Sequence, residues 1–203
     1  MNGQQQRTSQ MPSVHIVEGP TIWIIGDSYV RRGRDRAAET LGHNLGMAAH
    51  VQWFGRGGLR WSSLVPWLFR LLRGRSAPAV LLICCGSNDL GKVKSVDLVA
   101  AMKRDLLDLH RRYPSMDIFF SQLTDRRLWR DAQPGRINRA KRFINNVLKT
   151  FVSGLGGCMV CHPTIKFDCP GLFIRDGVHF SNMGNDIFLN NLATALKNHC
   201  HCV

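Results

Sequence analysis

The residue types that could do chemistry in this sequence are a serine, an aspartate and a histidine that lie far apart in the chain. Ser28 follows an apolar run from Thr21 to Ile25, whereas Asp176 and His179 are three residues apart near the other end. Acyl transfer needs a nucleophilic hydroxyl, a base that takes its proton and a group that orients the base. An aspartate three residues before a histidine can fold back and hold Nδ1–H, which leaves Nε2 free for the serine.

Acyl transfer also needs hydrogen-bond donors for the negative charge that develops on the carbonyl oxygen. A serine that a strand delivers to the first turn of a helix presents its own backbone N–H, which has no partner inside the helix. Two other turns could add donors: Gly57-Gly58 through the backbone N–H of Gly58, and Asn88 through its side-chain amide. The sequence therefore predicts an oxyanion hole made by Ser28, Gly58 and Asn88.

Each of these motifs also has a purely structural interpretation. Gly-Asp-Ser by itself is more often a turn than a nucleophile, and Asn88 could serve as a turn residue or helix cap. The segment from Asp176 to His179 could cap the helix that follows it. The combination favours chemistry, because every motif follows a predicted strand or directly precedes the last predicted helix.

The elements that must position these residues alternate between strands and helices. We expect strands at residues 21–25, 50–54, 78–85, 116–121 and 157–161. We expect helices at residues 31–45, 62–72, 96–113, 136–152 and 181–198. This alternation predicts a doubly wound, three-layer α/β/α sandwich with a mostly parallel sheet. Open folds of this class bind ligands at the carboxyl edge of the sheet.

Length and composition are typical of one folded domain. The chain has 203 residues and 44% hydrophobic content, which is enough to bury a sizeable core. We expect residues 1–20 to be a flexible leader or the cut point from a longer polypeptide, residues 21–199 to be the domain, and residues 200–203 to be a tail.

The net charge is strongly positive. The formal charge is +13, from 27 Lys and Arg against 14 Asp and Glu. Such a charge indicates an acidic neighbour, either RNA or an anionic membrane, although it could also serve only solubility. Arginines around Trp129 and on the helix after it could engage phosphates, with the indole stacking on a base. The expected basic surface consists of Arg126, Arg127, Arg130, Arg136, Arg139 and Arg142.

The sequence carries no recognisable export signal. No apolar run approaches the ~20 residues needed to span a bilayer, and residues 1–13 lack the apolar segment of a signal peptide. Seven cysteines is an odd number, and Cys84-Cys85 lie inside an apolar run, where we expect buried thiols without disulfides. We therefore expect an intracellular protein, cytoplasmic or nuclear, that is neither secreted nor membrane-spanning.

Two sets of cysteines and histidines could be taken for zinc sites. One set is Cys158, Cys161, His162 and Cys169, and the other is residues 199–202. Cys158 and Cys161 have odd spacing along a predicted strand, so their side chains would point to opposite faces instead of converging. The second set lies in the predicted tail. We therefore expect no metal and no other cofactor.

Other catalytic classes fit less well. The glycine-rich turn before Leu59 lacks the Gly-Lys-Ser/Thr ending of a P-loop. Val30 replaces the second glycine of the G-x-S-x-G elbow, which disfavours the usual α/β-hydrolase fold. Cys85 is a poor nucleophile candidate, because burial in an apolar strand raises the pKa of a thiol.

From Ile22 to the last predicted helix, the chain resembles the SGNH hydrolases, also called the GDSL esterase/lipase superfamily. The four blocks that carry the resemblance are Gly26-Asp27-Ser28, Gly57-Gly58, Gly86-Ser87-Asn88-Asp89 and Asp176-Gly177-Val178-His179. The resemblance implies a flavodoxin-like sheet of five parallel strands. It also implies Ser28 as nucleophile, His179 as general base, Asp176 as its orienting partner, and an oxyanion hole of Ser28, Gly58 and Asn88.

This sequence departs from the older family motif at one position. The residue after Ser28 is Tyr29 where the motif has leucine. We expect the tyrosine side chain only to pack.

A narrower resemblance concerns three stretches, two of which include blocks named above. Residues 22–30, 175–181 and 187–191 are similar to the esterase domain in the first open reading frame of some fish and other vertebrate non-LTR retrotransposons. That resemblance implies an intracellular ribonucleoprotein context. It also implies that a coiled-coil or RNA-binding region could precede the domain.

The sequence favours a serine ester hydrolase that cleaves short-chain acyl or lipid esters through an acyl-enzyme. The loops expected to line the substrate carry apolar side chains, which suit an acyl chain. These side chains are Trp129, Phe167, Leu172 and Phe173. The alternatives are a carbohydrate O-acetylesterase, or a basic module that binds RNA or anionic lipid and retains a residual hydrolase site.

Overall fold

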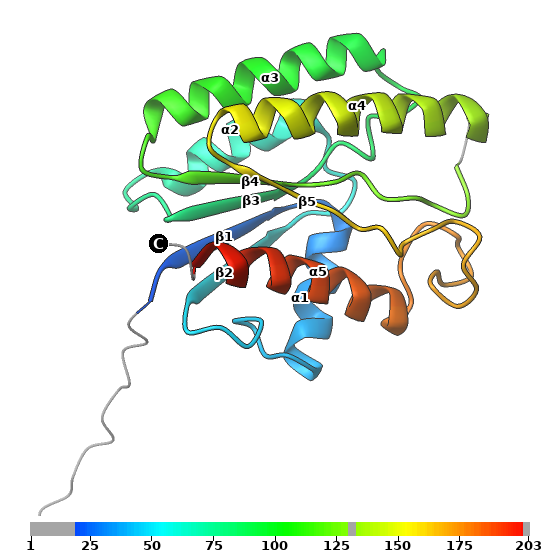
Figure 1. Ribbon diagram of the computed structural model, residues 1–203, viewed down its shortest axis with the longest axis horizontal. Helices are drawn as coiled ribbons and strands as arrows, with labels where there is room; N and C mark the ends of the chain where they lie inside the picture. The colour runs from blue at the N-terminus through cyan, green and yellow to red at the C-terminus, as the bar shows by residue number, and fades with distance from the viewer. Residues whose placement is uncertain (1–18, 130–132, 201–203) are drawn as a thin grey trace, which may run out of the picture.

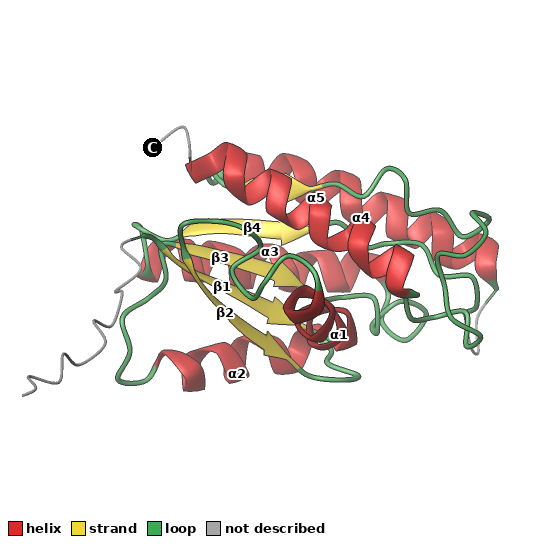
Figure 2. Cartoon of the chain, turned by 90° about the horizontal axis from the view of Figure 1, so that it is seen from below, coloured by secondary structure: helices red, strands yellow, loops and turns green. Residues whose placement is uncertain are grey.

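The computed structural model describes residues 19–129 and 133–200 of the chain. Its centre is one five-stranded sheet in the order β2-β1-β3-β4-β5, and all neighbouring strands are parallel. Figure 2 shows the arrows of the labelled strands pointing the same way. The strands are β1 (Thr21–Gly26), β2 (His50–Gly55), β3 (Val80–Cys84), β4 (Asp117–Ser121) and β5 (Cys158–Val160).

Helices cover both faces of this sheet. Helices α2, α3 and α4 lie on one face, and α1 and α5 lie on the other (Figure 1). The helices are α1 (Ser28–Glu39), α2 (Trp61–Leu72), α3 (Ser95–Arg112), α4 (Pro134–Gly154) and α5 (Asn182–Cys200). The predicted three-layer α/β/α sandwich with a five-stranded parallel sheet is therefore confirmed.

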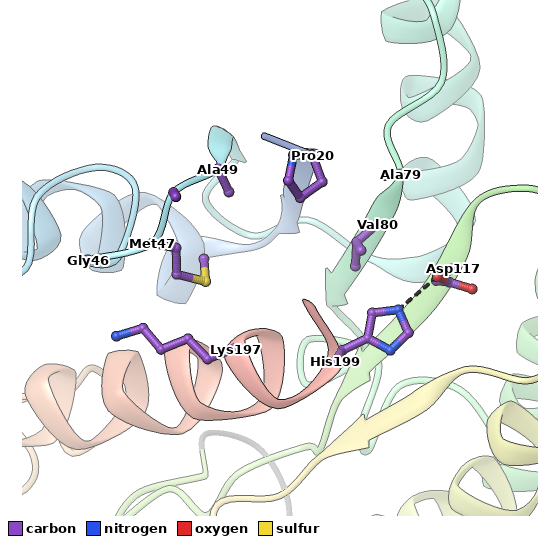
Figure 3. A pocket seen from close by; sticks show the side chains of 10 residues that line it. Pro20, Gly46, Met47, Ala49, Ala79, Val80, Asp117, Lys197 and His199 are labelled. Carbon is purple, nitrogen blue, oxygen red and sulfur yellow. Dashed lines mark hydrogen bonds and ion pairs between the residues drawn. The ribbon is translucent and has the colours of Figure 1, made fainter. Parts of the chain in front are cut away.

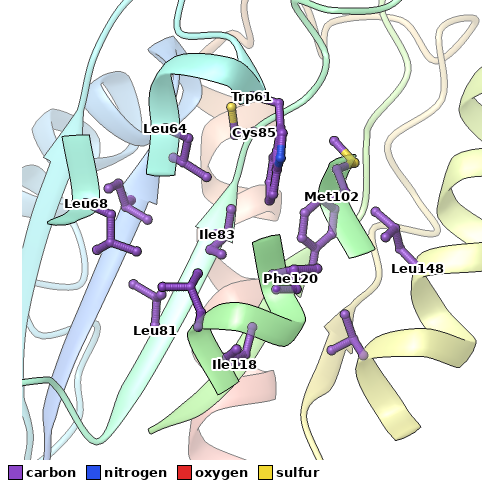
Figure 4. Close-up of a cluster of buried hydrophobic side chains, with 14 of the residues drawn as sticks. Trp61, Leu64, Leu68, Leu81, Ile83, Cys85, Met102, Ile118, Phe120 and Leu148 are labelled. Carbon is purple, nitrogen blue, oxygen red and sulfur yellow. The ribbon is translucent and has the colours of Figure 1, made fainter. Parts of the chain in front are cut away.

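The sheet separates two hydrophobic cores, because successive side chains of a strand point to opposite faces. In β1, Trp23 and Ile25 belong to the core under α2, α3 and α4, whereas Ile22 and Ile24 belong to the core under α1 and α5. Figure 4 shows the first core, where side chains of β3 and β4 meet those of the three helices. The central strands β1, β3 and β4 are almost entirely buried, as expected for parallel strands covered on both faces.

The predicted bounds of two helices were wrong. The first helix begins at Ser28, not residue 31, because Asp27 caps it by accepting a hydrogen bond from the backbone N–H of Tyr29. It ends at Glu39, not residue 45, and the chain then turns through residues with positive φ, among them Leu45 at 56°. Helix α4 begins at Pro134, two residues before the predicted start, because proline suits the first turn of a helix.

The strand order creates a switch point between β1 and β3. The chain adds β2 on one side of β1 and then places β3, β4 and β5 on the other side. In this flavodoxin-like order, the helices that follow β1 and β3 lie on opposite faces of the sheet, and folds of this class bind ligands at the carboxyl ends of such a pair of strands. The segments that carry Ser28 and Asn88 begin at these strand ends.

The described cysteines and helices bear on two further expectations. Cys84 and Cys85 are buried free thiols, as predicted. Burial raises the pKa of both thiols, which makes Cys85 a poor nucleophile. Within residues 19–129 and 133–200, no helix is long and apolar enough to cross a bilayer.

Candidate active site

The Gly-Asp-Ser block forms the junction between β1 and α1. Strand β1 ends at Gly26, and a Cβ at this position would lie 2.1 Å from the backbone oxygen of Cys84 in β3. Only glycine therefore allows β1 and β3 to approach this closely. Asp27 caps the helix, and Ser28 opens its first turn with 8% of its surface exposed. The backbone N–H of Ser28 belongs to the first turn, where N–H groups have no acceptor inside the helix.

A continuous chain of hydrogen bonds links Ser28, His179 and Asp176. Nε2 of His179 lies 3.1 Å from Oγ of Ser28, and Nδ1 of His179 lies 2.6 Å from Oδ2 of Asp176. The other carboxylate oxygen of Asp176 accepts hydrogen bonds of 2.9 Å from the backbone N–H groups of Val178 and His179. This turn holds the carboxylate against the imidazole, so residues 151 positions apart in the chain meet at one point.

The electrostatics of Asp176 fix the tautomer of His179. Burial raises the pKa of the Asp176 carboxyl, but the hydrogen bonds from the ring and backbone of His179 outweigh it and bring the pKa to about 2. The carboxylate is therefore ionised at neutral pH and can only accept a hydrogen bond. Nδ1 of His179 must carry the proton that it shares with Asp176, which leaves Nε2 of the neutral ring as an acceptor for the Ser28 hydroxyl.

Asn88 lies at the carboxyl end of β3, beside the serine. Its Nδ2 donates to the backbone oxygen of Leu59 at 3.0 Å and makes a longer contact of 3.4 Å with Oδ2 of Asp27. Gly86 has a φ of 122°, and a Cβ there would lie 2.6 Å from the Met102 side chain, so this turn requires glycine. The Asn88 amide thus has one strongly engaged N–H and one weakly engaged N–H directed to the serine block.

Gly58 lies in the turn that follows β2. Its φ is 69°, which glycine adopts without strain. The turn is fixed to β1 because the backbone N–H of Arg56 donates to the oxygen of Gly26 at 2.9 Å. Leu59, the residue after Gly58, accepts the hydrogen bond from Asn88. The structure therefore brings the Gly58 turn and the Asn88 turn together next to the start of α1.

Asp27 is a buried carboxyl next to the candidate nucleophile. Its exposed fraction is 1%. Burial raises its pKa to about 6, although the hydrogen bond from the Tyr29 backbone and the charge of Arg126 act in the opposite direction. This carboxyl therefore changes its protonation state within the range in which many enzymes operate.

Two residues near the site have contacts that the sequence did not predict. Tyr29 stacks on Phe180 at 4.5 Å, as expected of a packing residue, but its hydroxyl also donates to the backbone oxygen of Val178 at 2.8 Å. Arg126, predicted to belong to a basic surface, donates from Nε to the Tyr29 hydroxyl and from Nη2 to Oδ1 of Asn88, both at 3.2 Å. The one feature of the sequence that could have suggested these contacts is the hydroxyl group of Tyr29, directly after Ser28.

Three of the four residues predicted to line the substrate lie near these loops. Trp129 lies against the guanidinium of Arg126, 4.9 Å from it to the ring centre. Phe173 packs 5.7 Å from Phe180, and Leu172, which is 4% exposed, offers little surface to a ligand. Their role in substrate binding stays a prediction.

Phe167 lies in a different setting, in a polar cavity of about 530 Å³ at the same edge of the sheet. The cavity is formed by the segments that follow β4 and β5 and by one side of α4. Its basic side chains include Arg142 and Lys166, and Lys141 forms a buried ion pair with Asp125 at its wall. This cavity could hold a polar or anionic group.

A second cavity lies at the opposite edge of the sheet. Its volume is about 510 Å³, and its lining is mostly apolar (Figure 3). Pro20, Ala79 and Asp117, which line it, precede or begin β1, β3 and β4, whereas Ser28 and Asn88 follow the carboxyl ends of β1 and β3. The hydrogen bond of 2.8 Å between His199 and Asp117 therefore does not belong to the candidate active site.

Most of the predicted basic surface is exposed. Arg127, Arg136, Arg139 and Arg142 are exposed, and Arg126 is half-buried because it turns inward. Arg130 lies outside the described residues. Whether this surface binds RNA or lipid stays a prediction.

The cysteines and the histidine of the first candidate zinc set do not come together in the described structure. Among residues 19–129 and 133–200, no group of three or more His, Cys, Asp or Glu side chains could hold a metal ion. His162 instead lies 2.9 Å from Oγ of Ser121 and 3.1 Å from the Asn191 amide, and burial lowers its pKa to about 4. Residues 201 and 202 of the second set lie outside the described residues.

Comparisons with known proteins identify the fold. No protein-family model and no curated protein matches the sequence. Among solved structures, the chain is similar to a family 3 carbohydrate esterase from Clostridium thermocellum, with a TM-score of 0.71 and 15% identity over 91% of this chain and 98% of the other. A GDSL-like lipase from Bacteroides thetaiotaomicron has a TM-score of 0.70 and 13% identity over 89% of each chain.

A third structure, a lipolytic protein of the G-D-S-L family from Veillonella parvula, has a TM-score of 0.68. It is 12% identical over 87% of this chain and 98% of the other. The three similarities show that this chain has the α/β fold of GDSL-like lipases and esterases. At these identities they describe the fold, and function depends on the site.

Proposed function

We propose that this protein is a serine ester hydrolase of the SGNH superfamily that cleaves short-chain acyl or lipid esters through an acyl-enzyme. The observation that carries the proposal is the chain of hydrogen bonds from Ser28 through His179 to Asp176. It lies at the carboxyl edge of the sheet, at the switch point between β1 and β3. The shared fold with GDSL-like lipases and a carbohydrate esterase supports the same reaction class.

In the first step, Oγ of Ser28 attacks the acyl carbonyl while Nε2 of His179 takes the hydroxyl proton. The distance of 3.1 Å between these two atoms is within hydrogen-bond reach, as general-base catalysis requires. Asp176 stays ionised and stabilises the imidazolium that forms, because its carboxylate accepts the Nδ1 proton at 2.6 Å.

Three donors stabilise the oxyanion of the tetrahedral intermediate: the backbone N–H groups of Ser28 and Gly58, and Nδ2 of Asn88. The N–H of Ser28 is available because it lies in the first turn of α1. The N–H of Asn88 that makes only the long contact of 3.4 Å with Asp27 is the one available to a substrate oxygen.

Collapse of the intermediate breaks the ester bond, and the imidazolium of His179 gives its proton to the leaving alcohol. The acyl group then remains on Oγ of Ser28. His179, neutral again, removes a proton from water as the water attacks the acyl carbonyl. When this second intermediate collapses, the bond to Oγ of Ser28 breaks, and the imidazolium returns its proton to Oγ as the carboxylic acid leaves. The cycle needs no group beyond those in this chain and water.

The loops around the site support this substrate class. Trp129 and Phe173 lie on the loops that contact Arg126 and the His179 turn, and they suit a short acyl chain or lipid ester. The polar cavity beside α4 could hold a polar leaving group. This cavity and the similarity to a carbohydrate esterase favour a carbohydrate O-acetylester as the second candidate substrate.

The cellular setting is a separate part of the proposal. The resemblance of residues 22–30, 175–181 and 187–191 to the esterase domain of vertebrate retrotransposons supports a role inside a ribonucleoprotein particle. Within the described residues, Arg127, Arg136, Arg139 and Arg142 form no ion pair with an acidic side chain. They are therefore candidates for salt-dependent contact with RNA or an anionic membrane.

The test is turnover of nitrophenyl acetate and longer nitrophenyl esters, together with acetyl release from acetylated glycans. We expect hydrolysis by the unaltered chain and none above background by Ser28→Ala. Full activity in Ser28→Ala would refute the mechanism. Binding of single-stranded RNA or anionic vesicles by an inactive Ser28→Ala chain, with no hydrolysis by the unaltered chain, would favour the binding module instead.

A further inference from the structure

The half-buried Arg126 joins three of the loops that form the candidate active site. It comes from the segment between β4 and α4, which carries none of the four blocks of the superfamily. Its guanidinium contacts Asn88 in the loop after β3 and Tyr29 at the start of α1. Tyr29 in turn contacts Val178, the residue before His179. We propose that Arg126 is a positioning residue that holds the oxyanion donor Asn88 and the His179 loop in their reactive arrangement.

Arg126 determines which way the Asn88 amide faces. A guanidinium has only N–H donors, so the group that it contacts must be an acceptor. With Oδ1 of Asn88 held at 3.2 Å by Nη2 of Arg126, Nδ2 has to face the opposite direction, toward Leu59 and Asp27. A flipped amide would place two donors against each other at Arg126 and two acceptors against each other at Leu59. Nδ2 of Asn88 is therefore held beside Asp27, the residue before the serine, before a substrate arrives.

Through its contact with Tyr29, Arg126 also helps to position His179, the proposed general base. The Tyr29 hydroxyl accepts a hydrogen bond from Nε of Arg126 and donates its own proton to the backbone oxygen of Val178. Each of the two bonds fixes the direction of the other, since the hydroxyl has one proton. The peptide oxygen of Val178 directly precedes His179, so this bond restrains the backbone from which the imidazole extends.

The segment that carries Arg126 is itself rigidly attached. Both polar atoms of the buried Asn145 amide bond the backbone of Leu123, at 2.9 and 3.0 Å. The buried ion pair with Lys141 holds Asp125, the residue before Arg126. On the other side, the backbone N–H of Leu128 donates to the oxygen of Gly177 at 2.9 Å. A segment fixed at both ends can impose a position on Asn88 and Tyr29.

The planar shape of the Arg126 guanidinium matters as well as its positive charge. Nε and Nη2 reach two acceptors on different loops, and the guanidinium also lies 4.9 Å from the ring centre of Trp129. A lysine has one ammonium group and cannot reproduce both bonds and the stacking. Because the inference concerns positioning within the catalytic site, it rests on the proposed ester hydrolase function.

The experiment compares Arg126→Lys and Arg126→Ala with Arg111→Ala, the control. Arg111 is an exposed arginine of α3, and its replacement by alanine removes the same charge without the two bonds. We measure kcat and KM for nitrophenyl acetate and the thermal unfolding midpoint of each chain. We expect kcat to fall about 10- to 100-fold in both Arg126 variants with KM changed less than about threefold, because misplaced donors act on the transition state. Arg111→Ala should match the unaltered chain.

Two further measurements separate positioning from a general structural role. Added guanidinium ion at low millimolar concentration should restore part of the kcat lost in Arg126→Ala and none of the kcat lost in Asn88→Ala. Tyr29→Phe should lower kcat, and its effect should be less than additive with that of Arg126→Lys, because both act through one connected set of bonds. If Arg126→Ala does not fold, Arg126→Lys and Tyr29→Phe still test the proposal.

The outcomes distinguish this inference from the proposed function. If the unaltered chain hydrolyses no ester, the proposed function fails, and the inference fails with it. If the unaltered chain is active and Arg126→Lys keeps full kcat, the inference fails while the proposed function stands. A loss of kcat in Arg126→Ala that equals the loss in Arg111→Ala would also overturn it, because removal of either positive charge would then have the same effect.

Discussion

The buried carboxyl of Asp27 gives a prediction whose magnitude follows from the structure. Asp27 is 1% exposed, and burial raises its pKa from 3.8 to about 6. The perturbation is Asp27→Asn, which removes the titrating group but keeps a side-chain oxygen that can accept from the Tyr29 backbone N–H. The helix cap is therefore preserved, and the change of the variant's relative stability with pH reports the cost of the buried charge.

The sign follows from comparing the folded and unfolded chains. A carboxyl whose pKa is higher in the folded chain binds its proton more tightly there, so its contribution to stability is fully present below pH 3.8. That contribution is lost as the pH rises through about 6. A rise of about two pKa units corresponds to about 3 kcal/mol. The side chain is almost fully buried, so solvent screening does not reduce this figure appreciably.

The assay is urea denaturation of the unaltered chain and of Asp27→Asn between about pH 4 and pH 8. We expect the stability of Asp27→Asn relative to the unaltered chain to increase by about 2 kcal/mol across this range, less than the full difference because the unfolded carboxyl is already about half ionised at pH 4. The control is Asp35→Asn, since the Asp35 side chain is 60% exposed on α1; its relative stability should change little with pH. A relative stability of Asp27→Asn that does not vary with pH would refute the reasoning, because it would mean that Asp27 titrates alike in both states.

Three other substitutions test the site and its supports. Asn88→Ala should lower kcat by on the order of 10²–10³, the usual cost of one oxyanion donor, with unchanged unfolding behaviour as the control; normal kcat would exclude Asn88 from the oxyanion hole. Asp176→Asn should lower kcat by on the order of 10⁴ by stabilising the wrong tautomer of His179, and a rate within about tenfold of the unaltered chain would contradict the role given to the 2.6 Å bond. Gly86→Ala should destabilise the fold by more than about 1 kcal/mol in urea denaturation, because φ is 122° and Met102 fills the space of a Cβ. Equal stability of Gly86→Ala and the unaltered chain would show that this turn tolerates a side chain.

The sequence was informative where function depends on local segments. Ser28 could be placed because an apolar strand ends directly before it, and strand ends in an α/β fold determine which loops meet. Asp176 and His179 are only three residues apart and lie in one turn. The hydrogen bond between them could therefore be predicted without knowing how the rest of the chain folds. The bond from His179 to Ser28 could be expected only because the fold class brings both segments to one edge.

The contacts of Arg126 could not be predicted in the same way. Arg126 lies 97 positions from Tyr29 and 38 positions from Asn88 in the chain, and an irregular loop brings it to both. Such a loop has no helical or strand periodicity from which the direction of a side chain could be predicted. The sequence therefore indicated an exposed arginine, which is the usual setting of this residue type. The premature end of α1 at Glu39 was missed for a related reason, since residues 40–45 include both good and poor helix formers and the turn depends on tertiary packing of Leu45.

In the proposed mechanism, Ser28 is a nucleophile that His179 activates. The most direct measurement is covalent labelling with a fluorophosphonate, followed by mass spectrometry of the proteolytic peptides. We expect one adduct per chain, located on Ser28, with labelling abolished in Ser28→Ala and slowed by at least about 10²-fold in His179→Ala, because the hydroxyl then lacks its base. No adduct on Ser28, or equally fast labelling of the chain that lacks His179, would contradict the claim.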